Sequence, residues 1–326
     1  MKLIYKILIV VTLLFIGINS FLDSSIIVER STNIKRPVNQ VFMKVVNVKE
    51  WQNWDPWCTQ DSTINNTYPT VVYGLNSQRS WTSEESGSGN MTFTNVELNK
   101  KIDFDLQFIE PFESEASATF TFEQIEGKTK VSWSMSQEYP FLLRVFGLVA
   151  DMMIAPDFEL GLENLKVLCE TSRDPYHILM FEKEAFSVYS KKENCTTAEI
   201  GITLEHVYGE LIDKMAEDKI TVFGKPICIY HSYTDTEVEL EAALPVHQII
   251  NPSEYTKMIP AATVLKATYV GSYDKTQAAY NALDAFAAKN ELSVSDSHYQ
   301  IFITDPGTVS DPNKWVTEIY YTVTSL

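Results

Sequence analysis

The first ordered elements are predicted from the alternation of apolar and polar residues after position 25. In "IIVERSTNI" (26–34) the two kinds of residue alternate with a period of two, which is typical of a half-buried strand. "RPVNQVFMKVVNV" (36–48) follows, with Pro37 suited to a first helical turn. Val38, Val41 and Phe42 recur at helix spacing, so a short helix is expected there. It leads directly into "WQNWDPW" (51–57), which contains half of the six tryptophans.

Beyond the tryptophans, a run of alternating segments predicts an antiparallel sheet closed by a long helix. The segments are separated by Gly, Pro, Asn or charged turns and are "SQRSWTSEE", "GNMTFTNVEL", "KIDFDLQFIEP", "SEASATFTFEQIEG" and "TKVSWSMSQEYP". From Phe141 to about Thr171 leucines recur at helix spacing, and Pro156 is expected to kink or interrupt that helix. One strand, a short helix, several strands and a final helix predict a curved sheet that grips a helix.

After "TSRDPYH" (171–177) the pattern restarts and contains a repeat. "VELEAALPV" (238–246) aligns with "WVTEIYYTV" (315–323), which places Glu241 over Glu318 at an offset of 318 − 241 = 77. "IDKMA" (212–216) aligns with "LDAFA" (283–287) at 283 − 212 = 71, so the second copy has about six extra loop residues. Each copy predicts a strand, a helix and a hairpin. Two copies would form a pseudo-twofold domain with a groove between the halves, and the whole chain is expected to be α+β.

The N-terminal segment predicts a membrane anchor or a signal. Lys2 and Lys6 precede a run without charges from Ile7 to Leu22. Such a run is at the short end for a membrane span and is also compatible with a signal-peptide core. No lipoprotein-type cysteine follows, and "GINSF" is a poor cleavage site, so residues 1–26 are expected to be an uncleaved single-pass transmembrane helix. The lysines would stay in the cytoplasm, which places the C-terminal domains outside it. The alternative is a secreted or periplasmic protein after cleavage.

Composition and charge exclude several classes of function. The chain of 326 residues has 45% hydrophobic and 21% charged residues, which fits two globular domains. Its formal net charge of −17 argues against a nucleic-acid partner. The chain has no H-E-x-x-H, G-x-S-x-G, Walker or G-x-G-x-x-G motif. The four cysteines show no metal spacing; one disulfide remains open if the chain is exported, and buried thiols are the alternative. Neither a metal nor a cofactor is predicted.

Residues 27–172 resemble the polyketide-cyclase-like branch of the SRPBCC (START-like) superfamily. The resemblance is carried by "RPVNQVF", "WQNWDPW", "SWTSEESGSGNMTF", "TKVSWSM" and "DFELGLENLK", in the order of that family. It implies a helix-grip fold with an apolar cavity that binds lipids or other hydrophobic molecules. Trp54 and Trp57 are then candidates for the cavity mouth, and Trp81 and Trp133 for its wall. Packing in an ordinary core is the alternative for each of these tryptophans.

Residues 178–326 resemble the GyrI-like small-molecule-binding domain, also called the AraC-type effector-binding domain. "YVGSYDKTQAAYNALDAFAAKN" and the terminal "WVTEIYYTV" carry this resemblance. It implies binding of small, often aromatic or cationic molecules in a central groove. It also implies a related branch of hydrolases that use a glutamate on the last strand. The chain has no helix-turn-helix, so DNA binding is not expected.

Glu318 is the first candidate ligand-binding residue of this domain. Strand alternation puts Glu318 and Tyr320 on one face. A carboxylate among rings suits a lipophilic cation, and the segment from 178 has 21 acidic and 11 basic residues, a net of 21 − 11 = 10 negative charges. A salt-bridged glutamate is the alternative. Further candidates for the groove wall are Trp315, Tyr230, Phe302 and the repeat mate Glu241.

The sequence therefore predicts a membrane-anchored bacterial protein with two modules that bind small hydrophobic or lipophilic cationic molecules. The first alternative is a hydrolase in which Glu318 is the general base, which would require a raised pKa. The second is a scaffold for protein interactions.

Overall fold

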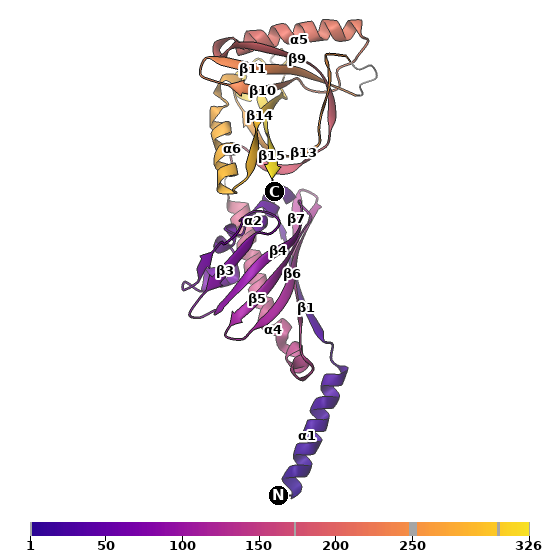
Figure 1. Cartoon of the computed structure of the whole chain (residues 1–326), viewed down its shortest axis with the longest axis vertical. Helices are drawn as coiled ribbons and strands as arrows, with labels where there is room; N and C mark the ends of the chain where they lie inside the picture. Colours follow the sequence, from indigo (N-terminus) through magenta and orange to yellow (C-terminus); the bar gives the residue numbers. More distant parts are fainter. Residues whose placement is uncertain (1, 173, 248–252, 305–306, 326) are drawn as a thin grey trace. The chain divides into compact units, whose positions relative to one another are not determined.

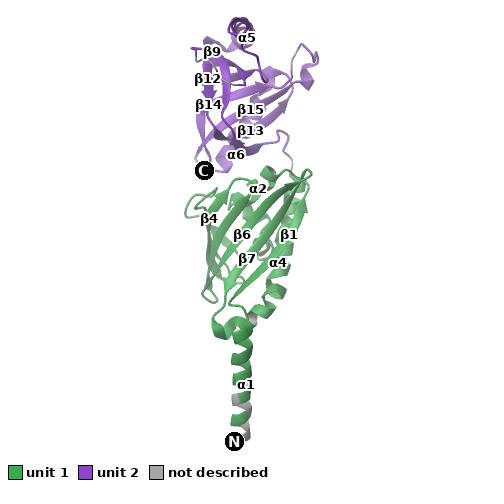
Figure 2. Cartoon of the chain, turned by 90° about the vertical axis from the view of Figure 1, so that its right-hand side faces the viewer, with its two compact units in different colours: residues 1–172 green, residues 173–326 purple. Residues whose placement is uncertain are grey.

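The chain folds as two compact units, each built on a curled antiparallel sheet. The computed structural model describes residues 2–172, 174–247, 253–304 and 307–325. The units are Met1–Ser172 and Arg173–Leu326 (Figure 2). Both combine helices with a sheet (Figure 1), which confirms the α+β class.

The first unit begins with α1 (Lys2–Phe21). The end of α1 is tied to the start of α4 (Arg144–Thr171), since Asn19 Oδ1 accepts a hydrogen bond of 3.2 Å from the Val145 amide. Within the part of the chain that the structure describes, no helix has both the length and the apolar character needed to span a bilayer. The prediction of a transmembrane helix over residues 1–26 is therefore not supported.

The sheet of the first unit has seven strands in the order β1-β7-β6-β5-β4-β3-β2. The strands are β1 (Ser25–Ile34), β2 (Asn65–Thr67), β3 (Gln78–Thr82), β4 (Ser88–Glu97), β5 (Lys101–Glu110), β6 (Ser114–Ile125) and β7 (Lys128–Glu138). Two short helices, α2 (Val38–Val46) and α3 (Pro56–Gln60), and the long α4 complete the unit. Alternation explains the sheet's two faces, because every second residue of β6 from Ala116 to Phe122 is buried.

The closing helix α4 is continuous through Pro156, so of the predicted kink or interruption the interruption is wrong. Pro156 removes one backbone donor and would weaken a helix most where the freed carbonyl is buried. Here Pro156 and Met152, one turn earlier, are both exposed. Water can therefore satisfy the freed carbonyl, and the helix continues.

Aromatic rings fill the space between the sheet and α4. Trp51 and Trp54 are buried, and their indole nitrogens donate to the carbonyls of Val45 (2.7 Å) and Lys44 (3.0 Å). Trp133 on β7 stacks on Phe158 of α4, with 4.1 Å between ring centroids. Trp51 and Trp54 of "WQNWDPW" therefore join α2 to the core of the unit.

The second unit has an eight-stranded sheet in the order β12-β9-β11-β10-β14-β15-β13-β8. Its elements are β8 (Leu179–Lys183), β9 (Phe186–Thr196), α5 (Ile200–Glu217), β10 (Ile227–Tyr233), β11 (Glu237–Val246), β12 (Thr256–Ile259), β13 (Ala262–Val270), α6 (Gln277–Lys289), β14 (Ser293–Phe302) and β15 (Val316–Ser325).

The internal repeat of the sequence is present in the sheet. Each copy consists of a strand, a helix and a hairpin, and the copies meet where β10 pairs with β14. Glu241 lies opposite Ile229 in the first hairpin, and Glu318 lies opposite Ile301 in the second. The two glutamates therefore occupy equivalent places, as the alignment of the two segments predicts.

Candidate functional site

The two faces of the second sheet have different partners. On one face, Leu204, Val207 and Leu211 of α5 pack against strand residues that include Cys228 and Leu240. The other face carries a separate apolar cluster with Ile229, Tyr299 and Tyr320. Because successive side chains of a strand point to opposite faces, each strand residue can be assigned to the helix-covered face or to the opposite face.

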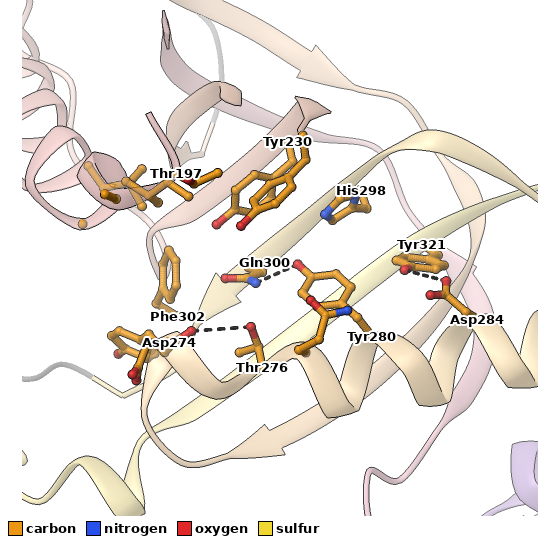
Figure 3. A pocket seen from close by; sticks show the side chains of 17 residues that line it. Thr197, Tyr230, Asp274, Thr276, Tyr280, Asp284, His298, Gln300, Phe302 and Tyr321 are labelled. Carbon is orange, nitrogen blue, oxygen red and sulfur yellow. Dashed lines mark hydrogen bonds between the residues drawn. The ribbon is translucent and has the colours of Figure 1, made fainter. Parts of the chain in front are cut away.

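A pocket of about 590 Å³ lies on the helix-covered face and is lined by residues of both α5 and α6 (Figure 3). This volume is within the ordinary range for small-molecule sites. The strands contribute alternate residues to it, namely His298, Gln300 and Phe302 from β14. The full lining is Thr197, Ala198, Ile200, Gly201, Leu204, Tyr230, Tyr233, Tyr273, Asp274, Thr276, Gln277, Tyr280, Asp284, His298, Gln300, Phe302 and Tyr321.

Hydrogen bonds between α6 and the strands fix the polar groups of the pocket. The hydroxyl of Tyr321 donates to Asp284 Oδ1 over 2.9 Å, and Gln300 Nε2 donates to the hydroxyl oxygen of Tyr280 over 2.7 Å. Both bonds run from a strand to the helix, as the dashed lines in Figure 3 show. The rings of Tyr280 and His298 meet edge to face at 5.1 Å between centroids. The pocket thus has a defined arrangement of rings and one carboxylate held by a phenol.

The charge of the pocket is negative at neutral pH. Its described lining includes Asp274 and Asp284 and no Lys or Arg. Burial lowers the pKa of His298, so its imidazole is uncharged at neutral pH. Burial, and for Tyr321 the hydrogen bond to Asp284, raise the pKa values of Tyr280 and Tyr321, so both phenols keep their protons. No group of this lining therefore balances the two carboxylates.

Glu318 and Tyr320 lie together on the opposite face and do not line this pocket. Lys266 Nζ donates to Glu318 Oε1 and the Tyr320 hydroxyl donates to Oε2, each over 2.6 Å. Burial acts to raise the pKa of Glu318, but these hydrogen bonds outweigh it and hold the pKa below its ordinary value. That direction is opposite to the one that the general-base alternative requires. A role for Glu318 and Tyr320 in ligand binding stays a prediction.

Glu241, the repeat mate, is enclosed in a network of its own. Its side chain is 4% exposed and accepts from Lys257 (2.7 Å), Ser190 (2.6 Å) and His231, whose Nε2 lies 2.8 Å away. Burial raises the pKa of Glu241 less than these bonds lower it. The network satisfies the carboxylate within the sheet, and a role of Glu241 in the groove wall stays a prediction.

The remaining candidates of the second unit are divided between the pocket and its surroundings. Tyr230 and Phe302 line the pocket, and the ring of Tyr230 stacks on that of His298 with 5.1 Å between the ring centroids. Trp315 does not line it. Its indole nitrogen donates to the Val309 carbonyl over 2.7 Å. The centroid of its ring lies 4.6 Å from that of Tyr273, a residue that does line the pocket.

Three of the four tryptophan candidates of the first unit share a small cavity of about 70 Å³. Trp57, Trp81 and Trp133 line it, whereas Trp54 is fully buried and lies outside its lining. Trp54 therefore packs in the core, while Trp57, Trp81 and Trp133 border the cavity, and of these three Trp81 and Trp133 are buried as well. A role of the tryptophans in ligand binding stays a prediction.

Sequence reasoning missed the residues that give the helix-side pocket its character. Gln277, Tyr280 and Asp284 follow one another at intervals of three and four, the spacing of one helix face, and all three line the pocket. This signal is present in "TQAAYNALD", but it indicates only a shared face. Strand alternation predicts Tyr321 on the face opposite Glu318, and the hydrogen bonds of the two residues confirm it.

The cysteines and acidic residues form no metal site among the residues that the structure describes, because no group of three or more His, Cys, Asp or Glu side chains is placed to hold an ion. All four cysteines are free thiols.

Comparison with known families identifies both units. Residues 25–170 match the family model described as polyketide cyclase / dehydrase and lipid transport. Residues 176–323 match the model of the GyrI-like small molecule binding domain. The chain therefore joins a polyketide-cyclase-like domain of the SRPBCC type to a GyrI-like domain, and both are small-molecule-binding types.

Several solved structures are similar to this chain. The crystal structure of the EcmrR C-terminal domain is 21% identical and covers 47% of this chain and 100% of its own, with a TM-score of 0.40. The cryo-EM structure of the EcmrR–DNA complex in EcmrR-RPo is 21% identical over 57% of this chain and 70% of its own, with a TM-score of 0.43. Protein CV1439 from Chromobacterium violaceum is 12% identical over 46% of this chain and 99% of its own, with a TM-score of 0.35. Among curated proteins none matches this chain.

Proposed function

We propose that the GyrI-like unit binds a small aromatic or lipophilic cation in the pocket between α5 and α6. The observation that carries this proposal is the lining itself, which combines tyrosine rings with Asp274 and Asp284 and includes no Lys or Arg among its described residues. Ring faces and carboxylates both attract a cation, and the attraction strengthens when the site excludes water.

The two carboxylates differ in what they can offer to a ligand. Asp284 already accepts a hydrogen bond from Tyr321 through Oδ1, which orients the carboxylate without neutralising it. Asp274 accepts from the hydroxyl of Ser272, which likewise adds no positive charge. By contrast, Glu318 is paired with Lys266. A cation that enters the pocket would therefore be the counter-charge of Asp274 and Asp284. Glu318 already has its counter-charge in Lys266.

Neutral hydrophobic ligands are the weaker competitors for this pocket. They would pack on the rings but make no electrostatic interaction with Asp274 and Asp284. The proposed preference is thus for the cation over a neutral molecule of the same shape, and it is measured as a ratio of two affinities.

The test uses phenyltrimethylammonium and its uncharged isostere tert-butylbenzene on the full chain, with calorimetric titration. The cation is expected to bind at least about ten-fold more tightly. Asp284→Asn should reduce cation affinity by about ten-fold, since one of two carboxylates is lost, and leave tert-butylbenzene unchanged.

Glu318→Gln is the matched control, because it removes the same charge from the opposite face of the same sheet. It should leave the affinity for the cation within about two-fold of wild type. Equal affinities for the two isosteres, or a loss of cation binding in Glu318→Gln without one in Asp284→Asn, would reject this site.

We also propose that the N-terminal segment directs the two domains across a membrane. Lys2 and Lys6 followed by the uncharged run from Ile7 to Leu22 support this location. Fractionation of cells that express the full chain, followed by protease treatment of intact spheroplasts, tests it. Digestion from outside is the expected result, and full protection with recovery in the soluble fraction would contradict it.

A further inference from the structure

The first unit contains a buried ion pair beside its tryptophans. The side chains of Arg79 on β3 and Asp55, which precedes α3, are 6% and 1% exposed, and Nη2 lies 2.8 Å from Oδ2. The guanidinium carbon is 5.7 Å from the ring centroid of Trp51 and 5.6 Å from that of Trp81. The pair and the rings together hold the guanidinium in one position.

The ion pair leaves several of its own polar atoms without a hydrogen-bond partner. Arg79 Nε and Nη1 are buried and unpartnered, as is Asp55 Oδ1. The indole nitrogen of Trp133 is in the same condition. Buried polar groups are almost always hydrogen-bonded in folded proteins, so a cluster of such atoms indicates a partner outside the chain, which is either water or the polar head of a bound molecule.

All three of these residues line the same cavity of about 70 Å³. Its other walls are mostly apolar and include Met91, Phe104, Leu106 and Phe108. The cavity therefore has hydrogen-bonding groups and apolar walls within one small space. Because a cavity needs only about 10–15 Å³ to hold one water molecule, this space can hold several heavy atoms, such as the head and first carbon atoms of a larger molecule.

The charges and hydrogen-bonding groups together define the kind of head that fits. Arg79 and Asp55 cancel each other's charge, so an ionised head would add an unbalanced charge to a buried place. A carboxylate would face Asp55 Oδ1, and an ammonium would face the guanidinium. An uncharged group that accepts from Arg79 or Trp133 and donates to Asp55 meets neither penalty.

We propose that this cavity binds the uncharged hydrogen-bonding head of an amphipathic molecule, with a primary amide as its best-matched form. The amide oxygen accepts from the guanidinium and the indole N–H, and the amide N–H donates to Asp55 Oδ1. The aliphatic part lies along the aromatic wall. This site belongs to the first unit and is independent of the cation pocket of the second.

Three probes are compared at pH 8. Hexanamide both accepts and donates hydrogen bonds, 2-heptanone only accepts them, and hexanoate carries a negative charge. Intrinsic tryptophan fluorescence reports binding, because Trp57, Trp81 and Trp133 line the cavity. The full chain with Trp315→Phe removes the one tryptophan of the second unit and leaves the five of the first. Hexanamide is expected to bind at least about ten-fold more tightly than either of the other probes.

Two variants separate recognition from structure. Arg79→Met combined with Asp55→Leu replaces the pair by apolar side chains, a change that folded proteins tolerate, and the preference for hexanamide should fall below about two-fold. Asp55→Asn keeps the shape but leaves the guanidinium uncompensated, so hexanoate should bind at least about ten-fold more tightly than to wild type. A purely structural pair predicts no such gain.

Three results would overturn the proposal. They are no saturable fluorescence change with any probe, equal affinities of the three probes for wild type, and a wild type that prefers hexanoate. If the double variant does not fold, the gain of hexanoate binding in Asp55→Asn decides the question alone, and its absence rejects the site.

Discussion

Lys266 donates a hydrogen bond of 2.6 Å to Glu318 across the neighbouring strands β13 and β15. The side chains are 16% and 20% exposed, so the pair is largely withdrawn from solvent. With Tyr320 donating to the second carboxylate oxygen, Glu318 has its charge and both oxygens satisfied within the sheet. Glu318 is thus paired within the sheet, whereas Asp284 lies on the other face, in the lining of the helix-side pocket together with Asp274.

Glu318→Gln is expected to destabilise the second unit by roughly 1–3 kcal/mol, because it leaves the ammonium of Lys266 without its counter-charge in a largely buried place. Urea unfolding followed by circular dichroism measures the change. The double substitution Lys266→Met with Glu318→Leu is the control and should recover most of the loss, since neither charge remains. A Glu318→Gln protein as stable as wild type would show that the pair contributes nothing.

The tryptophans of "WQNWDPW" should differ in their contribution to stability. Trp54 is fully buried and its indole donates to the Lys44 carbonyl, so Trp54→Phe is expected to cost roughly 2–4 kcal/mol through lost contacts and an unsatisfied carbonyl. Trp57 is only half-buried, and Trp57→Phe should cost less than about 1 kcal/mol. Chemical unfolding followed by the remaining tryptophan emission compares the two. Equal costs would contradict the assignment of Trp54 to the core.

A close approach of α4 to α3 gives a prediction at Gly161. A Cβ at this position would lie 2.8 Å from Pro56 Cδ and 2.9 Å from Trp133 Cζ3. Gly161→Ala should therefore destabilise the first unit by roughly 1–3 kcal/mol, although alanine is the better helix former. Gly209→Ala on α5 is the matched control, because a Cβ at that position would have nothing within 4 Å. That control should be neutral or stabilising by up to about 1 kcal/mol, and a neutral Gly161→Ala would show that α4 can shift.

Much of the fold follows from local patterns, because strand alternation and helix spacing are properties of neighbouring residues. The repeat predicts equivalent positions for Glu241 and Glu318 in two hairpins, and the sheet register agrees. Alternation also predicts Glu318 and Tyr320 on one face, where they share a hydrogen bond. These relations need no knowledge of distant residues.

The residues of the helix-side pocket could not be predicted in this way, because the pocket depends on contacts between residues that are far apart in the sequence. Alternation cannot say which face of a sheet the helices cover, and this decides whether Glu318 or Tyr321 meets the pocket. Lys266, the partner of Glu318, is 52 residues away along the chain. The buried pair of Asp55 and Arg79 likewise joins a turn to a strand. Polar partners of this kind become visible only when the strands are in register.

Cation binding in the pocket should weaken as the pH falls through the pKa of His298, which lies below the ordinary value of about 6.5 for histidine. Burial lowers the pKa of His298 in the folded chain from that value, so its imidazole is uncharged at neutral pH and gains a proton only as the pH falls through the lowered pKa. The added positive charge lies in the same lining as Asp284 and repels a bound cation, while tert-butylbenzene should be unaffected. His298→Gln should remove this weakening of phenyltrimethylammonium binding, as measured by calorimetric titration at pH values from about 7.5 downwards. If the variant keeps the pH dependence of the wild type, another group titrates, and protonation of His298 does not set the affinity of this pocket for cations.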